Sequence, residues 1–214
     1  MHIVAWNAEG LRTKVPELQS WLPTVKADVV AIQEAQFTAK SLTRIPGFQP
    51  PVVTRRGRGR AAGAAARGGG DVAIYVRGGL TFAPLPDRLV SPDDDTTEAC
   101  GVRILGTTNL DIINIYRPPI RNTQEDEREE RFDPGALPVN DATLLVGGVN
   151  THHPFWNHAC EVEDTVGRRL ADWMDGVGWT PLNSGEPMHV SYWSGGSTAP
   201  DLVACSRGLA KRST

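Results

Sequence analysis

The chain has 214 residues, of which 40% are hydrophobic and 22% charged, and its formal net charge at pH 7 is -3. These values are typical of an ordinary globular protein, so they exclude a disordered chain and favour one domain over residues 1–214. No apolar run reaches the roughly 18 residues that cross a bilayer, and the N-terminus lacks the basic head of a signal peptide. We therefore expect an intracellular protein with no membrane partner, while the net charge neither supports nor excludes DNA.

Short runs rich in Val and Ile recur along the chain and predict buried strands. In chain order these strands are expected at residues 3–6, 29–33, 72–76, 110–116, 143–146 and 189–193. Apolar residues at helical spacing predict two helices, over residues 15–22 and 166–174, with Thr13 and Asp164 as their N-caps. Because strands outnumber helices, we predict an α/β protein whose helices cover the outer faces of its sheets.

Residues 54–70 read TRRGRGRAAGAAARGGG, and their five arginines among Gly and Ala predict a mobile basic loop. Cys100, Cys160 and Cys205 are odd in number and widely spaced, which fits neither a disulfide framework nor a CxxC zinc site. We expect these cysteines to be small core residues.

Polar side chains stand at the ends of predicted strands, where α/β proteins build their sites. Glu34 can hold a hard cation such as Mg²⁺, which prefers oxygen ligands, or can simply begin a solvated loop. Asn7 can steer a ligand or phosphate oxygen, or make an Asx turn. Tyr116 can donate to a phosphate with Arg117 neutralising its charge, or can be a packed aromatic residue.

Three of the five histidines, His152, His153 and His158, fall in one short stretch. Such a cluster is typical of metal or acid–base sites. Neither Cys nor a carboxylate stands at zinc-ligand spacing beside them, so loop structure is the favoured interpretation of the cluster.

Six segments in order carry a more specific signal: WNAEGL (6–11), DVVAIQEA (28–35), GGGDVAIYVR (68–77), NIYRPP (114–119), GGVNTHHPFW (147–156) and STAPDLVACS (197–206). This series resembles the apurinic/apyrimidinic-like endonuclease domain of non-LTR retrotransposons, in the endonuclease/exonuclease/phosphatase superfamily. The resemblance implies a DNase I-like, two-sheet β-sandwich flanked by helices, with a Mg²⁺ or Mn²⁺ site at one edge. It also implies nicking of DNA to prime reverse transcription, a reverse transcriptase domain on the same polypeptide, and a nuclear location.

The resemblance also assigns roles to individual residues. Glu34 is similar to the metal-binding carboxylate, and Asn7 to the residue beside it that orients the metal or the phosphate. Tyr116 is similar to the donor to the scissile phosphate, and Asn150 to the asparagine that aligns the nucleophile. Asp201 is similar to the carboxylate that orients a catalytic histidine.

Two departures from the family pattern lower the expected activity. The family reads Gly-Asp-x-Asn where this chain reads GGVN at 147–150, so Gly148 replaces the catalytic aspartate and cannot accept a proton. The family closes with a strand bearing Ser-Asp-His, but no histidine follows His189, so Asp201 has none to orient. We expect weak or absent nicking, a C-terminal truncation that removes the last strand, and an unpaired edge at the strand near 198–204.

Three functions remain open at this stage. The leading hypothesis is a metal-dependent DNA endonuclease. The second is a non-catalytic remnant that binds nucleic acid through the arginine loop, and the third is a phosphoesterase acting on a small molecule. Candidate substrate-binding residues are Arg117, His152 and His153, and His152 can chemically stand in for a missing catalytic group.

Overall fold

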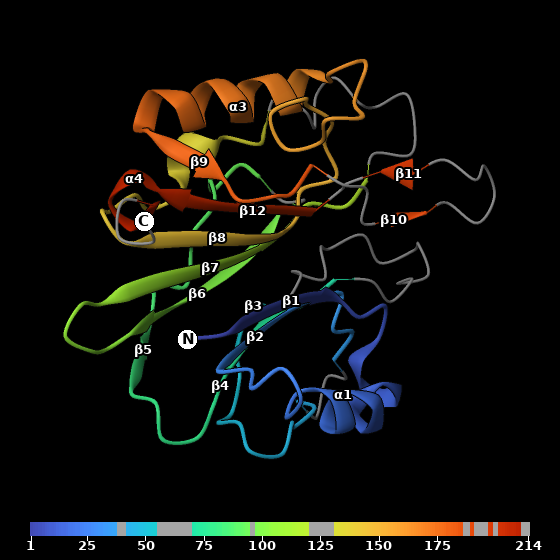
Figure 1. Cartoon of the computed structure of the whole chain (residues 1–214), viewed down its shortest axis with the longest axis vertical. Coiled ribbons are helices and arrows are strands. Elements are labelled where there is room, and N and C mark those ends of the chain that lie inside the picture. Colours follow the sequence, from blue (N-terminus) through green and yellow to red (C-terminus); the bar gives the residue numbers. More distant parts are fainter. Residues whose placement is uncertain are drawn as a thin grey trace.

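The computed structural model describes residues 1–37, 42–54, 70–94, 97–119, 131–185, 189–190, 197–198 and 201–210. Almost all of the predicted basic loop at 54–70 lies outside these ranges, as do residues 191–193 of the strand predicted at 189–193. Two sheets lie face to face, with helices on their outer sides (Figure 1).

The first sheet takes its strands from the N-terminal part of the chain. Its order is β1 (Ile3–Asn7), β2 (Val29–Gln33), β4 (Val72–Val76) and β3 (Val52–Thr54). β1 and β2 are parallel, whereas β4 runs antiparallel to both of its neighbours. The apolar runs at 29–33 and 72–76 are therefore strands with the predicted bounds.

The second sheet has six strands in the order β5 (Phe82–Pro84), β6 (Glu98–Ile104), β7 (Leu110–Tyr116), β8 (Thr143–Gly148), β12 (Asp201–Ser206) and β9 (Trp179–Pro181). β7 and β8 are parallel and the other neighbours are antiparallel. A separate pair, β10 (His189–Val190) and β11 (Ser197–Thr198), forms a short antiparallel ribbon.

β12 lies between β8 and β9 and pairs with both. The prediction that this strand would present an unpaired edge is therefore wrong, because β9 comes from an earlier part of the chain and covers it.

The helices cover the outer faces of the two sheets, as predicted (Figure 1). α1 (Val15–Trp21) follows the 3-10 turn η1 (Leu11–Thr13) and packs Leu18 on the first sheet. α3 (Thr165–Val177) packs Leu170 and Met174 on the second sheet, between η2 (Pro134–Ala136) and β9. A final turn, α4 (Arg207–Ala210), follows β12.

The two predicted N-caps have different outcomes. Asp164 caps α3, because its Oδ1 accepts the Gly167 N–H at 2.6 Å. Thr13 is not a cap, because it lies inside the 3-10 turn and Lys14 takes the N-cap position without a side-chain hydrogen bond.

An apolar layer fills the space between the sheets. Along each strand, side chains that point into this layer alternate with side chains that point toward the helices. The layer contains Val29, Ala31, Val72, Ile74, Val76, Cys100, Val102, Ile112, Leu144, Val146 and Cys205. Burial raises the pKa of the Cys100 and Cys205 thiols, so both stay protonated and behave as small apolar residues, as predicted. Cys160 differs, because it is only half-buried and donates to the Val162 carbonyl outside the core.

The part of the chain that the structure describes contains no helix with the length and hydrophobicity needed to cross a membrane.

Candidate active site

Four strands deliver polar residues to one end of the sandwich. β1 and β2 are parallel, and so are β7 and β8, so the carboxyl ends of each pair lie together. We call the end where β2 and β7 finish the site end, and the opposite end of the two sheets the far end. The sequence-predicted residues Asn7, Glu34 and Tyr116 all stand at the site end.

Glu34 is the centre of this group. Its Oε1 accepts a hydrogen bond from Asn7 Nδ2 at 3.0 Å and another from the Tyr116 hydroxyl at 2.5 Å. Asn7 comes from the first sheet and Tyr116 from the second, so one carboxylate oxygen joins the two sheets. Neither hydrogen bond uses Oε2, the second carboxylate oxygen.

The local backbone explains how Glu34 reaches this position. β2 ends at Gln33, and Glu34 has a left-handed φ of 49°, which turns the chain sharply. The turn is held by backbone hydrogen bonds, with the Gly10 N–H donating to the Glu34 carbonyl at 2.8 Å. The Asn7 amide is also fixed, because its Oδ1 accepts the Glu9 N–H at 3.3 Å while its Nδ2 donates to Glu34.

Tyr116, Gly148 and Asp201 stand side by side in register on β7, β8 and β12. A Cβ atom added to Gly148 would lie 3.2 Å from Asp201 Oδ1 and 3.3 Å from Tyr116 Cδ2. The side chain that Gly148 lacks would therefore stand between the Asp201 carboxylate and the Tyr116 ring. Asp201 is half-buried, and its carboxylate lies next to Gly148.

Asn150 and Arg117 are linked to each other through the backbone. Asn150 has a left-handed φ of 46°, and its Nδ2 donates to the Arg117 carbonyl at 2.6 Å. The Arg117 N–H in turn donates to the Gly148 carbonyl at 2.8 Å. Arg117 as a whole is 3% exposed, so it lies inside the protein wall beside the site.

The two adjacent histidines differ in their surroundings. His153 Nδ1 accepts the Phe155 N–H at 3.1 Å, and its Nε2 lies 3.0 Å from Glu163 Oε2. A neutral ring with the proton on Nε2 satisfies both contacts, so the His153 ring is tied into its own loop. His152 is exposed, and only its backbone is held, by Asp164.

A family model described as the endonuclease/exonuclease/phosphatase family matches residues 4–209. The chain belongs to the endonuclease/exonuclease/phosphatase family. The resemblance expected from the six sequence segments is thereby confirmed.

Known relatives of this family member agree with its fold. The endonuclease domain of TRAS1, a telomere-specific non-LTR retrotransposon, superposes with a TM-score of 0.66 at 17% identity, over 98% of this chain and 86% of that domain. The 3'-5' exonuclease NExo from Neisseria meningitidis gives a TM-score of 0.68 at 16% identity, over 99% and 89%. These likenesses confirm the predicted DNase I-like, two-sheet fold.

The chain is also similar to one part of a longer curated protein. The Drosophila melanogaster protein called "Probable RNA-directed DNA polymerase from transposon BS" is 24% identical over 193 residues, which is 90% of this chain. The chain spans about a fifth of the length of that relative, 20%.

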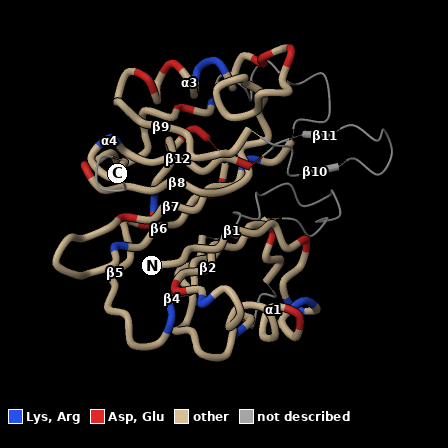
Figure 2. Tube along the Cα trace, viewed as in Figure 1, with Lys and Arg blue, Asp and Glu red and all other residues tan. Residues whose placement is uncertain are grey.

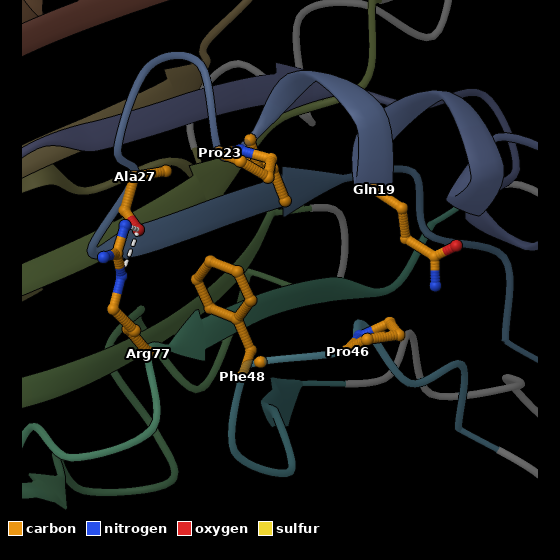
Figure 3. Close-up of a pocket in the computed structure, with 8 residues that line it drawn as sticks. Gln19, Pro23, Ala27, Pro46, Phe48 and Arg77 are labelled. Atoms are coloured by element: carbon orange, nitrogen blue, oxygen red, sulfur yellow. Dashed lines mark hydrogen bonds between the residues drawn. The ribbon is translucent and has the colours of Figure 1, made fainter.

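A cleft of about 530 Å³ in this family member lies at the far end, and Figure 3 shows residues that line it. Its lining includes Ala27, which precedes β2, and Arg77, which follows the antiparallel strand β4. Arg77 donates from Nε to the Ala27 carbonyl at 2.8 Å and lies 3.5 Å from Asp28. The Arg77 guanidinium is therefore held by its neighbours. Apart from Arg77 and Gln19 the lining of the cleft is apolar, so it has no group of polar residues comparable to that around Glu34.

Acidic and basic residues are scattered along the described part of the chain in the view of Figure 2. Among the described residues no three His, Cys, Asp or Glu side chains stand close enough to hold a metal together. The residues at Glu34 nevertheless suit Mg²⁺ or Mn²⁺, because such ions are often held by one or two carboxylates and otherwise keep their water ligands.

Sequence reasoning missed two polar residues beside the site. Gln33 and Asn114 lie within apolar strands, are 1% and 0% exposed, and hydrogen-bond to each other across the two sheets at 2.5 Å. Their signal in the sequence is an amide within an otherwise apolar strand, which in a buried strand requires a partner.

Proposed function

We propose that the chain is a metal-dependent endonuclease domain of a non-LTR retrotransposon that nicks target DNA to prime reverse transcription. The observation that carries the proposal is the convergence of Asn7 and Tyr116, from different sheets, on one oxygen of Glu34. The likeness to the TRAS1 endonuclease domain and to the transposon BS polymerase supports this branch of the family.

In this proposal Glu34 holds a Mg²⁺ or Mn²⁺ ion through its carboxylate, with Asn7 beside it. The bound ion supplies charge neutralisation at the scissile phosphate. Asn7 keeps the carboxylate in place, because its own amide is fixed by the Glu9 backbone.

Tyr116 and Asn150 handle the phosphate in this scheme. The Tyr116 hydroxyl donates to a phosphate oxygen, and Asn150 aligns the attacking water. Arg117 supports this wall of the site, because its carbonyl oxygen accepts a hydrogen bond from the Asn150 side chain. In this scheme the exposed side chain of His152 can contact substrate, whereas the ring of His153 is bonded within its loop.

In this scheme the Asp201 carboxylate, which lies beside Gly148, receives the proton of the attacking water, because Gly148 offers no base. Its Oδ1 lies 3.2 Å from the point where a Gly148 Cβ would stand. A displaced base is less effective than a well-aligned one, and loss of a general base commonly costs about 10² to 10⁴ in rate. We therefore expect slow nicking.

A nicking assay on supercoiled plasmid with Mg²⁺ or Mn²⁺ tests this function. We expect slow conversion to open circles by the wild-type chain, and at least about a 100-fold lower rate for Glu34→Gln, which keeps the shape of the side chain but removes its charge. Glu17→Gln on the exposed side of α1 is the matched control and should nick at the wild-type rate. Equal nicking by Glu34→Gln and wild type would contradict the proposal, as would nicking that survives a chelator.

The second candidate is a domain that binds nucleic acid without cutting it. Gly148 favours it, because the position beside Asp201 and Tyr116 lacks a side chain that can act as a base. Salt-sensitive DNA binding with no nicking in either metal would support this alternative.

The transposon BS relative, which is longer than this chain, suggests where in the cell and beside which domain either activity takes place. We propose that the chain works in the nucleus beside a reverse transcriptase domain on the same polypeptide, since the relative's printed name is that of an RNA-directed DNA polymerase.

A further inference from the structure

Asn114 is a polar residue within an otherwise apolar stretch of β7, between Ile113 and Ile115. Its side chain points into the layer between the sheets, on the same face of the strand as Tyr116 two residues later. It is 0% exposed, so each of its polar atoms requires a partner within the protein.

The Asn114 amide binds three groups of the opposite sheet. Its Oδ1 accepts from Gln33 Nε2 at 2.5 Å, and its Nδ2 donates to the Ile32 carbonyl at 2.9 Å and the Ala73 carbonyl at 3.1 Å. Ile32 and Ala73 are paired residues on β2 and β4. One side chain of the second sheet therefore holds two adjacent strands of the first.

This amide bracket, formed by Asn114 and Gln33, stands directly behind the candidate site. Gln33 precedes Glu34, and Asn114 precedes Tyr116 by two residues. The bracket therefore fixes the two sheets to each other one or two residues before the Glu34–Tyr116 hydrogen bond. A buried amide pair hydrogen-bonded across two sheets favours one register, whereas apolar packing alone permits small slips.

We infer that Asn114 and Gln33 are positioning residues that set the Glu34 carboxylate for its divalent cation. The inference rests on the proposed function, because it assumes that Glu34 holds the cation. Neither residue touches the cation or the substrate. Each acts by fixing the distance between the strand end that carries Glu34 and the strand end that carries Tyr116.

Mn²⁺ binding measured by calorimetry on the whole chain tests the inference independently of nicking. Gln33→Met removes the hydrogen bond between Gln33 and Asn114 but keeps the length of the side chain and leaves the two other cross-sheet bonds, from Asn114 to the Ile32 and Ala73 carbonyls, in place. Asn114→Ser removes all three. We expect the Mn²⁺ dissociation constant to rise about 10-fold for Gln33→Met and further for Asn114→Ser, the range typical of groups that support metal ligands.

Ser206→Ala is the matched control. Ser206 is buried in β12, and its Oγ accepts the Thr143 N–H at 3.0 Å, at the start of β8 and thus at the far end. It should lower the melting temperature while leaving the Mn²⁺ dissociation constant within twofold of wild type.

The outcomes separate the two proposals. Wild-type Mn²⁺ affinity in folded Gln33→Met would overturn the positioning role of Gln33, and wild-type affinity in folded Asn114→Ser would overturn that of Asn114. Either result would leave the proposed function standing. If the Glu34→Gln variant bound Mn²⁺ as tightly as the wild-type chain does, the proposed function would be overturned, and this inference with it. Gln33→Met keeps the test valid if Asn114→Ser fails to fold.

Discussion

The two ends of the sandwich differ in the conformation of their backbone. Six described residues other than glycine have a left-handed φ. Five of them lie in loops at the site end: Glu9, Glu34, Gln36, Asp71 and Asn150. Lys26 at the far end is the sixth.

This contrast has an energetic meaning. A left-handed residue with a side chain costs about 1 kcal/mol or more relative to the usual conformation. At the far end only one described residue other than glycine, Lys26, carries such strain, and Arg77 and Asp28 partner each other and nearby backbone. Strained backbone gathered at one end favours that end as the functional one, in agreement with the position of Glu34.

The largest expected effect would break the site end directly. Gly147 has a φ of 135°, and a Cβ atom there would lie 1.9 Å from the Ile115 carbonyl oxygen. We expect Gly147→Ala to lower the free energy of unfolding by about 4 kcal/mol or more, because backbone must move to admit the methyl group. Urea unfolding measures the change.

Gly176→Ala is the control for that substitution. Gly176 lies in α3 with no atom within 4 Å of an added Cβ. This variant should gain about 0.5–1 kcal/mol in unfolding free energy. If both alanine variants unfolded at the same urea concentration, the tight contact at Gly147 would be disproved.

A smaller change in the free energy of unfolding is expected for two aspartate substitutions, which test the difference between the two ends. The Gly167 N–H donates to Asp164 Oδ1 and the His152 N–H donates to Asp164 Oδ2, each at 2.6 Å. Asp164→Ala should lower the free energy of unfolding by about 1–2 kcal/mol and speed hydrogen exchange at the His152 amide, because a cap and a loop anchor are lost together.

Asp28→Ala at the far end provides the comparison. Asp28 accepts the His2 N–H at 2.8 Å and lies near Arg77. Its removal should cost about 1 kcal/mol or less. Exchange at His152 should stay at the wild-type rate, and acceleration there would contradict the separation of the two ends.

The smallest effect compares strain at the two ends. Lys26→Gly relieves a left-handed φ of 51° and should raise the free energy of unfolding by roughly 0.5–1 kcal/mol. Glu34→Gly relieves similar strain, but its gain is offset by the loss of the hydrogen bonds from Asn7 and Tyr116. Thermal melts with and without Mn²⁺ test both variants.

Mn²⁺ should raise the melting temperature of Lys26→Gly as it does that of wild type, and should leave that of Glu34→Gly unchanged. Stabilisation of Glu34→Gly by Mn²⁺ would mean that the strain at Glu34 serves no metal site.

The sequence predicted those parts of the fold that local pattern encodes. The strands β2, β4 and β7 have the predicted bounds, because they are buried on both faces and their sequences are mostly apolar. β6 was missed, since its run EACGVRI mixes polar residues and glycine with apolar ones. The short edge strands β5 and β9 each end in proline, which masks them as loops.

The residues of the candidate site also include some that local sequence pattern predicts and others that it does not. Polar residues at strand ends identified Asn7, Glu34 and Tyr116, and their contacts join strands far apart in sequence. The amide bracket and the position of Asp201 beside Gly148 were not predictable, because both depend on which strands are neighbours in space. Strand pairing is set by the whole chain rather than by any local segment.

The position of β12 between β8 and β9 has a consequence for synthesis on the ribosome. β9 leaves the ribosome before β12, yet it has no strand to pair with in the second sheet until β12 arrives. During that interval β8 is an open edge that can recruit other chains. Asp201 reaches its place beside Gly148 in the same step that covers the edge of β8, so a nascent chain acquires this carboxylate only when β8 is paired on both sides.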